Sequence, residues 1–170
     1  MKFVIVPGGG TGGYGRKNFI SLRTVQFDLY TCKGIAHEMA HFWWHNAEAN
    51  TWEDWLNEAF AEYSMLMYLR EKIDINIFNR YISEYKKKVE KSPPIWGIDR
   101  AKPEAYSALY EKGSLILMEF EEKLGQEQFL DFLRLILKEK VANTNEFLDL
   151  IEKVLPKDIR LWFENKLKTY

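Results

Sequence analysis

Residues 37–41 are His37-Glu38-Met39-Ala40-His41, two histidines four positions apart with a glutamate beside the first. On an α-helix, side chains four residues apart project from the same face, one turn above the other. His37 and His41 are therefore candidates for two ligands of one metal ion. Glu38 is rotated by about 100° from His37, so its carboxylate is placed to address a water beside the metal rather than the metal itself.

A second apolar-periodic stretch, residues 52–72, supplies the carboxylates that such a site needs. A catalytic zinc site has three protein ligands and one open position, and we expect Glu58 to be the third ligand beside the histidine pair. Glu62 lies four residues after Glu58 on the same helix face, where it can accept a hydrogen bond from the far nitrogen of a ligating imidazole. The pattern predicts a zinc hydrolase site in which Glu38 accepts the proton of a water and passes it to the leaving amine.

These residues can also be interpreted without a metal site. A bare His-Glu-x-x-His pattern occurs by chance in many proteins, but this chain has three histidines and two of them stand in the motif. His45 follows His41 by four residues and would extend the same helix face. Three ligands spread over two turns, about 12 Å of rise, diverge from one metal. We therefore expect His45 to be a rim or surface residue.

The composition limits the classes of protein to which the chain can belong. Its length of 170 residues favours a single domain. Apolar residues make up 46% and aromatic residues 15%, as in a globular protein rather than a disordered one. The formal net charge of −1 gives no general attraction to nucleic acid or anionic membranes, and no apolar run is long enough to span a membrane. The sequence therefore predicts neither as a partner.

Cys32 is the single cysteine of the chain, so no intramolecular disulfide can form and a reducing compartment is favoured. We expect its thiol to be a buried small hydrophobic group rather than a nucleophile. The apolar run at residues 3–6 is too short for a signal peptide. The expected location is the cytoplasm.

The predicted fold class is α+β and mostly helical. Residues 3–6 and 19–22 are β-rich and flank a glycine cluster at residues 8–15, which predicts short strands or a hairpin. From about Thr31 onward the pattern is helical. The expected helices span residues 33–46, 52–72 with Thr51 as N-cap, 75–91, 103–124, 126–140, 144–154 and 157–168. We expect one catalytic domain over residues 1–170, with a small β part at 1–30 that has a glycine-rich edge and a helical part at 31–170 that holds the zinc site.

These motifs resemble those of a known family. The histidine motif followed by Phe42-Trp43-Trp44, and then the segment Trp52-Glu53-Asp54-Trp55-Leu56-Asn57-Glu58-Ala59-Phe60-Ala61-Glu62-Tyr63, look like the catalytic domain of the zinc aminopeptidases of the alanyl aminopeptidase family. That family belongs to the gluzincins and has a thermolysin-like fold. Tyr110-Glu111-Lys112-Gly113 is similar to the family's Tyr-Glu-Lys-Gly segment, and the resemblance covers roughly residues 3–132. It implies that the hydroxyl of Tyr110 stabilises the oxyanion of the tetrahedral intermediate, with Tyr106 as a second candidate.

The chain departs from that family in three places. Sixteen residues separate His41 from Glu58, whereas the family usually has eighteen, so we expect a shorter connection between the two helices. The family's Gly-Ala-Met-Glu-Asn strand, whose glutamate binds the α-amine of the substrate, aligns with residues 12–16. Gly15 stands there in place of the glutamate, with the cationic Arg16 beside it. The family's large N-terminal β-domain is also missing, so we expect a minimal member or a fragment of a longer protein.

The glycine cluster permits a rival interpretation. Gly8, Gly10 and Gly13 have the spacing of the dinucleotide-binding fingerprint. That fingerprint requires a helix to open at the third glycine, whereas residues 18–22 have the character of a strand. We instead expect the cluster to form a backbone edge that pairs with an extended peptide.

Together these features predict a zinc-dependent metallopeptidase, aminopeptidase-like but without the amine-binding glutamate, that hydrolyses peptide bonds with a metal-activated water. The expected site comprises the ligands His37, His41 and Glu58, the catalytic residues Glu38 and Tyr110, and Glu62 behind the ligands. The alternative is a latent or inactive zinc-binding gluzincin fragment with a regulatory role. The expected partner is a peptide or protein substrate, and the sequence indicates neither an oligomeric state nor a choice between exo- and endopeptidase action.

Overall fold

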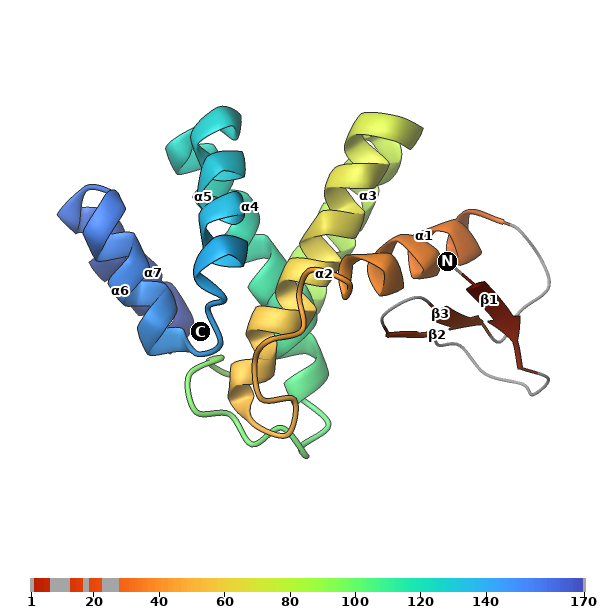
Figure 1. The fold of residues 1–170 in the computed structure, drawn as a ribbon, viewed down its shortest axis with the longest axis horizontal. Helices are drawn as coiled ribbons and strands as arrows, with labels where there is room; N and C mark the ends of the chain where they lie inside the picture. Colours follow the sequence, from red (N-terminus) through yellow and green to blue (C-terminus); the bar gives the residue numbers. More distant parts are fainter. Residues whose placement is uncertain (1, 7–12, 17–18, 23–27, 170) are drawn as a thin grey trace.

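A small three-stranded sheet precedes a helical body in the computed structural model of the chain (Figure 1). The structure describes residues 2–6, 13–16, 19–22 and 28–169. The strands are β1 (Lys2–Ile5), β2 (Gly13–Arg16) and β3 (Phe19–Leu22). The α-helices are α1 (Leu29–Ala40), α2 (Trp55–Tyr68), α3 (Ile75–Val89), α4 (Gly113–Leu124), α5 (Gln126–Glu139), α6 (Thr144–Val154) and α7 (Lys157–Lys168). The predicted class, α+β and mostly helical, is confirmed.

In the sheet, β3 lies between the other two strands. It pairs in parallel with β1, where Phe3 is opposite Ile20, and antiparallel with β2, where Tyr14 is opposite Ser21. The strand predicted at residues 19–22 is confirmed, and the one predicted at 3–6 begins one residue earlier. The sheet packs on α1 through β2 and β3. Figure 1 shows it at one end of the molecule, with α6 and α7 at the other.

The first helix differs from its prediction at both ends. It begins at Leu29, because the Asp28 carboxylate accepts a hydrogen bond from the Thr31 backbone N–H at 2.8 Å and caps the helix. It ends at Ala40 and not at residue 46. The chain leaves the helix there because the segment that follows is bound to α2. The Asn57 side chain exchanges two hydrogen bonds of 3.1 Å with the backbone of Ala47.

The helices predicted at residues 52–72 and 103–124 are each divided. The first consists of a 3₁₀ turn (η1, Trp52–Asp54), α2 and a π-helical turn (η2, Leu69–Ile73), and Thr51 caps the 3₁₀ turn as predicted. The second contains a π-helical segment (η3, Ser107–Lys112) before α4. Such turns depend on tertiary packing and leave no simple periodicity in the sequence. The last two predicted helices, α6 and α7, have their expected bounds, and the bounds of α3 and α5 differ by one or two residues at the C-terminal end.

An aromatic cluster holds α2 in the middle of the helical body. The buried Trp55 ring lies 5.3 Å from the Phe147 ring and 5.8 Å from the Phe163 ring, measured between centroids. Its indole N–H donates to the Thr144 hydroxyl at 2.8 Å. Full burial of one large apolar side chain contributes about 1.5–3 kcal/mol. Because α2 carries Glu58 and Glu62, this packing fixes the position of both carboxylates.

Gly113 allows α4 to approach α2 closely at the level of the candidate site. A Cβ atom built on Gly113 would lie 2.5 Å from the Cβ of Ala59, the residue next to Glu58. Tyr110 precedes Gly113 by three residues. The contact between Gly113 and Ala59 therefore sets the spacing between the segments that carry Tyr110 and Glu58.

We expect Gly113→Ala to lower the free energy of unfolding by about 1–3 kcal/mol, because an extra methyl group overpacks this contact. Urea unfolding of the metal-free protein measures the change. The double variant with Ala59→Gly should recover most of the loss. Gly34→Ala is the matched control, since a Cβ on Gly34 of α1 meets no atom within 4 Å. Equal effects at the two glycines would contradict the packing argument.

Candidate metal centre

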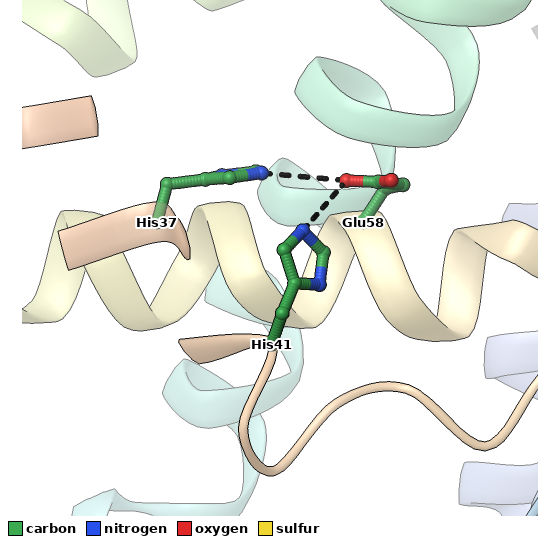
Figure 2. Close-up of side chains that lie close together, drawn as sticks. All are labelled: His37, His41 and Glu58. Atoms are coloured by element: carbon green, nitrogen blue, oxygen red, sulfur yellow. Dashed lines mark ion pairs between the residues drawn. The ribbon is translucent and has the colours of Figure 1, made fainter. Parts of the chain in front are cut away.

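Three side chains from two helices converge on one point. Nε2 of His37 and Nε2 of His41 each lie 3.3 Å from the same oxygen of Glu58, Oε2. Figure 2 shows both imidazole rings directed at this carboxylate. One ligand atom of each residue can be chosen so that all lie within 4.8 Å of one another. Within the part of the chain that the structure describes, this is the group of three that could hold a metal ion.

The other nitrogen of each imidazole is occupied by a hydrogen bond. Nδ1 of His37 lies 2.7 Å from Oε2 of Glu62, and Nδ1 of His41 lies 3.1 Å from the backbone carbonyl oxygen of Trp44. A carbonyl or carboxylate oxygen only accepts, so Nδ1 is the donor in both rings. In the neutral tautomer, each Nε2 then presents its lone pair toward Glu58, as a metal ligand must.

One atom of this group lacks a hydrogen-bond partner. Oε2 of Glu58 is buried and accepts no hydrogen bond in the described part of the chain. A buried carboxylate oxygen without a partner is unfavourable unless a cation compensates it. Two imidazole nitrogens and one carboxylate oxygen form a donor set that zinc accepts. The residues present therefore fit a zinc ion.

The electrostatics of the metal-free site show how strongly these groups interact. Burial lowers the pKa of His37, but the carboxylates of Glu58 and Glu62 outweigh it and raise that pKa to about 10. Burial likewise opposes the rise in the pKa of His41, which the Glu58 carboxylate causes. Burial raises the pKa of Glu62, yet hydrogen bonding and charge from His37 bring it to about 2. The carboxylates of Glu58 and Glu62 thus favour positive charge at this position, as the site of a metal cation requires.

Tyr110 lies beside this group, on η3. Its ring is stacked on that of His37, with the centroids 6.0 Å apart and the planes at 7°. Its hydroxyl oxygen accepts a hydrogen bond from Nη2 of Arg100 at 3.3 Å. Burial and the Glu58 carboxylate raise the pKa of Tyr110. The phenol is therefore protonated at neutral pH.

The other candidate residues take different positions. Glu38 is half-buried on α1 between the two histidines. The Tyr106 ring stacks on that of Tyr110 at 4.4 Å and is 53% exposed. His45 is exposed and lies beyond the end of α1, so it does not extend the helix face as the spacing suggested. Cys32 is a free thiol and is half-buried, not fully buried as predicted.

The sequence did not predict the side chains that hold Arg100 in hydrogen-bond contact with Tyr110. Nε of Arg100 donates to Oδ2 of the buried Asp54 at 2.8 Å, and Nδ2 of Asn57 donates to the other oxygen at 2.9 Å. Asp54 and Asn57 are three residues apart at the start of α2, a spacing that could have indicated their contact. Arg100 lies outside the regular helices, and nothing in the sequence places it near Tyr110.

Only part of the glycine cluster lies within the residues that the structure describes. Gly8, Gly10 and Gly12 lie outside the described residues, whereas Gly13 begins strand β2. The dinucleotide fingerprint needs a helix at that position, so the nucleotide-binding alternative is wrong. Gly15 lies within β2, opposite Ile20 of β3.

The sequence matches the model of the peptidase family M1 domain over residues 21–165. The match extends beyond residue 132, where the resemblance was expected to end, and begins later than expected. The membrane alanyl aminopeptidase of Heliothis virescens is 31% identical over an alignment of 129 residues, and the match covers 68% of this chain and 13% of that protein.

The fold is similar to those of solved M1 zinc metallopeptidases. A mutant of a two-domain M1 zinc metallopeptidase bound to L-tryptophan superposes with a TM-score of 0.82 at 17% identity, covering 98% of this chain and 38% of that one. The M1 zinc metallopeptidase of Deinococcus radiodurans gives a TM-score of 0.79 at 18% identity, with the same coverage of 98% and 38%. At these identities the similarity establishes the fold.

The chain thus spans well under half the length of these relatives. Among the described residues, no helix has both the length and the apolar character that crossing a bilayer requires.

Proposed function

The chain belongs to peptidase family M1, and from this premise we propose that it is a zinc-dependent peptidase, or the zinc-binding part of one. The observation that supports this proposal is the convergence of His37 and His41 on Oε2 of Glu58, a buried oxygen that accepts no hydrogen bond from any described residue. We propose these three residues as the zinc ligands. A bound zinc ion supplies a Lewis acid that polarises a carbonyl oxygen and lowers the pKa of a water.

Glu38 is the proposed general base. It follows His37 on α1 and is rotated by about 100° from it, so its carboxylate does not compete with the ligands. It accepts a proton from the water that attacks the scissile carbonyl carbon, and it delivers that proton to the leaving amine. General acid–base catalysis of this kind contributes about 10²–10⁴-fold to the rate.

Tyr110 is the proposed donor to the oxygen on which negative charge develops. The Arg100 guanidinium has donors only, so the phenol oxygen accepts from it at 3.3 Å. The phenol proton is then left to be donated to another acceptor. Stacking on His37 places Tyr110 next to the proposed ligands. A donor fixed before the reaction stabilises the transition state without further reorganisation.

We propose that an extended substrate lies along β2. This strand pairs with β3 and has no second neighbour among the described strands. An unpaired strand edge can add the backbone of a peptide. Gly15 of β2 has no carboxylate with which to bind the α-ammonium group of a substrate. Strict dependence on a free amino terminus is therefore not part of the proposal.

We expect peptides with a blocked amino terminus to be cleaved at least as readily as matched peptides with a free one. The measurement compares kcat/KM for the two series, with chromatographic identification of the cleavage site and with chelated enzyme as the blank. A preference of about 100-fold or more for free amino termini, equivalent to about 2.7 kcal/mol, would contradict the role assigned to Gly15. It would leave the peptidase assignment intact.

A latent zinc-binding module is the second candidate, favoured by the missing carboxylate at Gly15 and by the 38% coverage of the solved relatives. The comparison of blocked and free peptides, together with metal analysis, distinguishes this module from an active peptidase. A protein that retains one zinc ion per chain and cleaves neither series has this second function. A protein that takes up no zinc has neither.

The proposed partner is a peptide or protein substrate. The cytoplasm remains the proposed compartment, on the ground of the single cysteine.

A further inference from the structure

The carboxylate of Glu62 is held at both of its oxygens. Its side chain is 4% exposed. Oε2 lies 2.7 Å from Nδ1 of His37, as described above. At Oε1 it accepts a hydrogen bond from the Tyr85 hydroxyl, and the Nζ of Lys33 lies 3.5 Å from the same oxygen. The residue behind the histidine ligand is thus itself fixed by two further side chains.

The hydrogen bonds that connect Lys33, Tyr85, Glu62 and His37 can be assigned in one consistent direction. Nζ of Lys33 lies 3.1 Å from the Tyr85 hydroxyl, and an ammonium group donates only. The Tyr85 oxygen therefore accepts from Lys33, and its proton goes to Oε1 of Glu62. The ionised carboxylate accepts only, so Oε2 accepts from Nδ1–H of His37. Nε2 of His37 is then the ring nitrogen that faces Glu58.

The residues come from three helices. Lys33 lies on α1, one turn before His37, Glu62 lies on α2 and Tyr85 lies on α3. The Tyr85 side chain is buried. Helix α3 therefore reaches the candidate metal centre through the hydroxyl of Tyr85, although that residue does not contact the proposed ligands in any described hydrogen bond or ion pair.

We propose that Tyr85 and Lys33 are positioning residues for zinc, which act through Glu62 to hold His37 in the orientation and tautomer of a metal ligand. The inference rests on the proposed function in one respect, the assignment of His37 as a zinc ligand. Without the Tyr85 hydroxyl, Oε1 of Glu62 loses the hydrogen bond that fixes the carboxylate. Without Lys33, both the donor to Tyr85 and the neighbouring positive charge are lost. In either case His37 is held less firmly toward the metal.

The chain contains a matched control for this arrangement. The buried Tyr63 hydroxyl donates to Glu121, whose carboxylate is also bound by Arg70 at 2.8 Å. This second group has the same composition, a buried tyrosine, a glutamate and a cation. Among the described residues, however, its carboxylate makes no hydrogen bond or ion pair with His37 or His41. Removing the Tyr63 hydroxyl therefore tests the effect of losing a buried tyrosine–carboxylate hydrogen bond by itself.

The experiment measures zinc affinity by competition with a chromophoric chelator for the wild type and for Tyr85→Phe, Lys33→Met and Tyr63→Phe. Loss of a partner outside the ligand set lowers metal affinity by about 10–100-fold. We expect about a 10-fold loss for Tyr85→Phe, a loss of similar size for Lys33→Met and a change of less than about 2-fold for Tyr63→Phe. The double variant Tyr85→Phe/Lys33→Met should lose less than the product of the single losses, because the two residues act through one carboxylate.

Two further readouts separate positioning from a general structural role. Unfolding of the metal-free proteins should show that Tyr85→Phe and Tyr63→Phe are destabilised to a similar degree. The absorption spectrum of the cobalt(II)-substituted protein should change in Tyr85→Phe and stay unchanged in Tyr63→Phe, because only the first variant loosens a ligand. Neither measurement depends on peptidase activity.

The inference is overturned if Tyr85→Phe binds zinc as tightly as the wild type, or if Tyr63→Phe loses as much affinity as Tyr85→Phe. Both outcomes leave the zinc site and the proposed peptidase in place. Failure of the wild type to bind zinc removes the proposed function and the inference together. The wild-type titration therefore distinguishes the two failures.

Discussion

Glu38→Gln is expected to lower peptide hydrolysis by about 10³-fold while zinc binding stays at one ion per chain. The amide has the shape of the carboxylate but cannot accept the proton of the attacking water. Because Glu38 is not among the three residues whose ligand atoms converge, the metal remains bound. Steady-state kinetics on a fluorogenic peptide and metal analysis of the same preparation measure the two effects.

Glu164→Gln is the control for this substitution. Glu164 is a helical glutamate of α7, where it pairs with Arg160 and Lys168. Figure 1 shows α7 at the end of the molecule opposite the sheet. We expect its variant to hydrolyse the peptide at the wild-type rate. Normal turnover by Glu38→Gln would remove the residue from the role of general base. Loss of zinc from that variant would show that the carboxylate helps to hold the metal.

His41→Ala is expected to lower zinc affinity by more than about 100-fold. Loss of a residue that only supports a ligand lowers metal affinity by at most about 100-fold, and loss of a ligand itself should lower it further. The substitution removes one of the three proposed zinc ligands, the imidazole whose Nε2 lies 3.3 Å from Oε2 of Glu58. It also removes the hydrogen bond to the Trp44 carbonyl. A ligand that binds only the folded state at 100 times its dissociation constant stabilises it by about 2.7 kcal/mol. Zinc should therefore raise the melting temperature of the wild type and leave that of His41→Ala unchanged.

His45→Ala controls for the loss of an imidazole in general. His45 is exposed four residues further along, and its variant should bind zinc and respond to it in thermal unfolding as the wild type does. If His45→Ala lost zinc as His41→Ala does, the proposed ligand set would have to change. If His41→Ala retained wild-type affinity, the ligand set would be wrong.

Much of the helical body was predictable because local rules determine it. The bounds of α6 and α7 agree with the predictions, and Gly125 ends α4 with φ of 80°, a conformation that glycine adopts readily. The end of α1 was not predictable. His41 to Asn46 have no helix-breaking residue, and they leave the helix because contacts with α2, such as that between Ala47 and Asn57, compete successfully with local propensity.

The candidate site likewise has a part that the sequence predicts and a part that it does not. A spacing of four residues places His37 and His41 on one face of α1, and the same spacing places Glu58 and Glu62 on one face of α2. Helical geometry determines these relations, and the sequence displays them. The side-chain partners from other segments, Arg100 beside Tyr110 and Tyr85 beside Glu62, come from elsewhere in the chain. No periodicity connects them with the motif.

The sequence by itself determined the family, the mostly helical fold and the set of residues that we propose to bind and use a metal, because each depends on residue type and on spacing within one helix. The tertiary structure alone decided which hydrogen-bonding partners surround those residues. It turns Nε2 of both histidines toward Glu58, leaves a buried carboxylate oxygen without a hydrogen bond from the described part of the chain, and connects α3 to the site through Tyr85. The physical reason is that such contacts join segments far apart in the chain, and their geometry is set by how the helices pack.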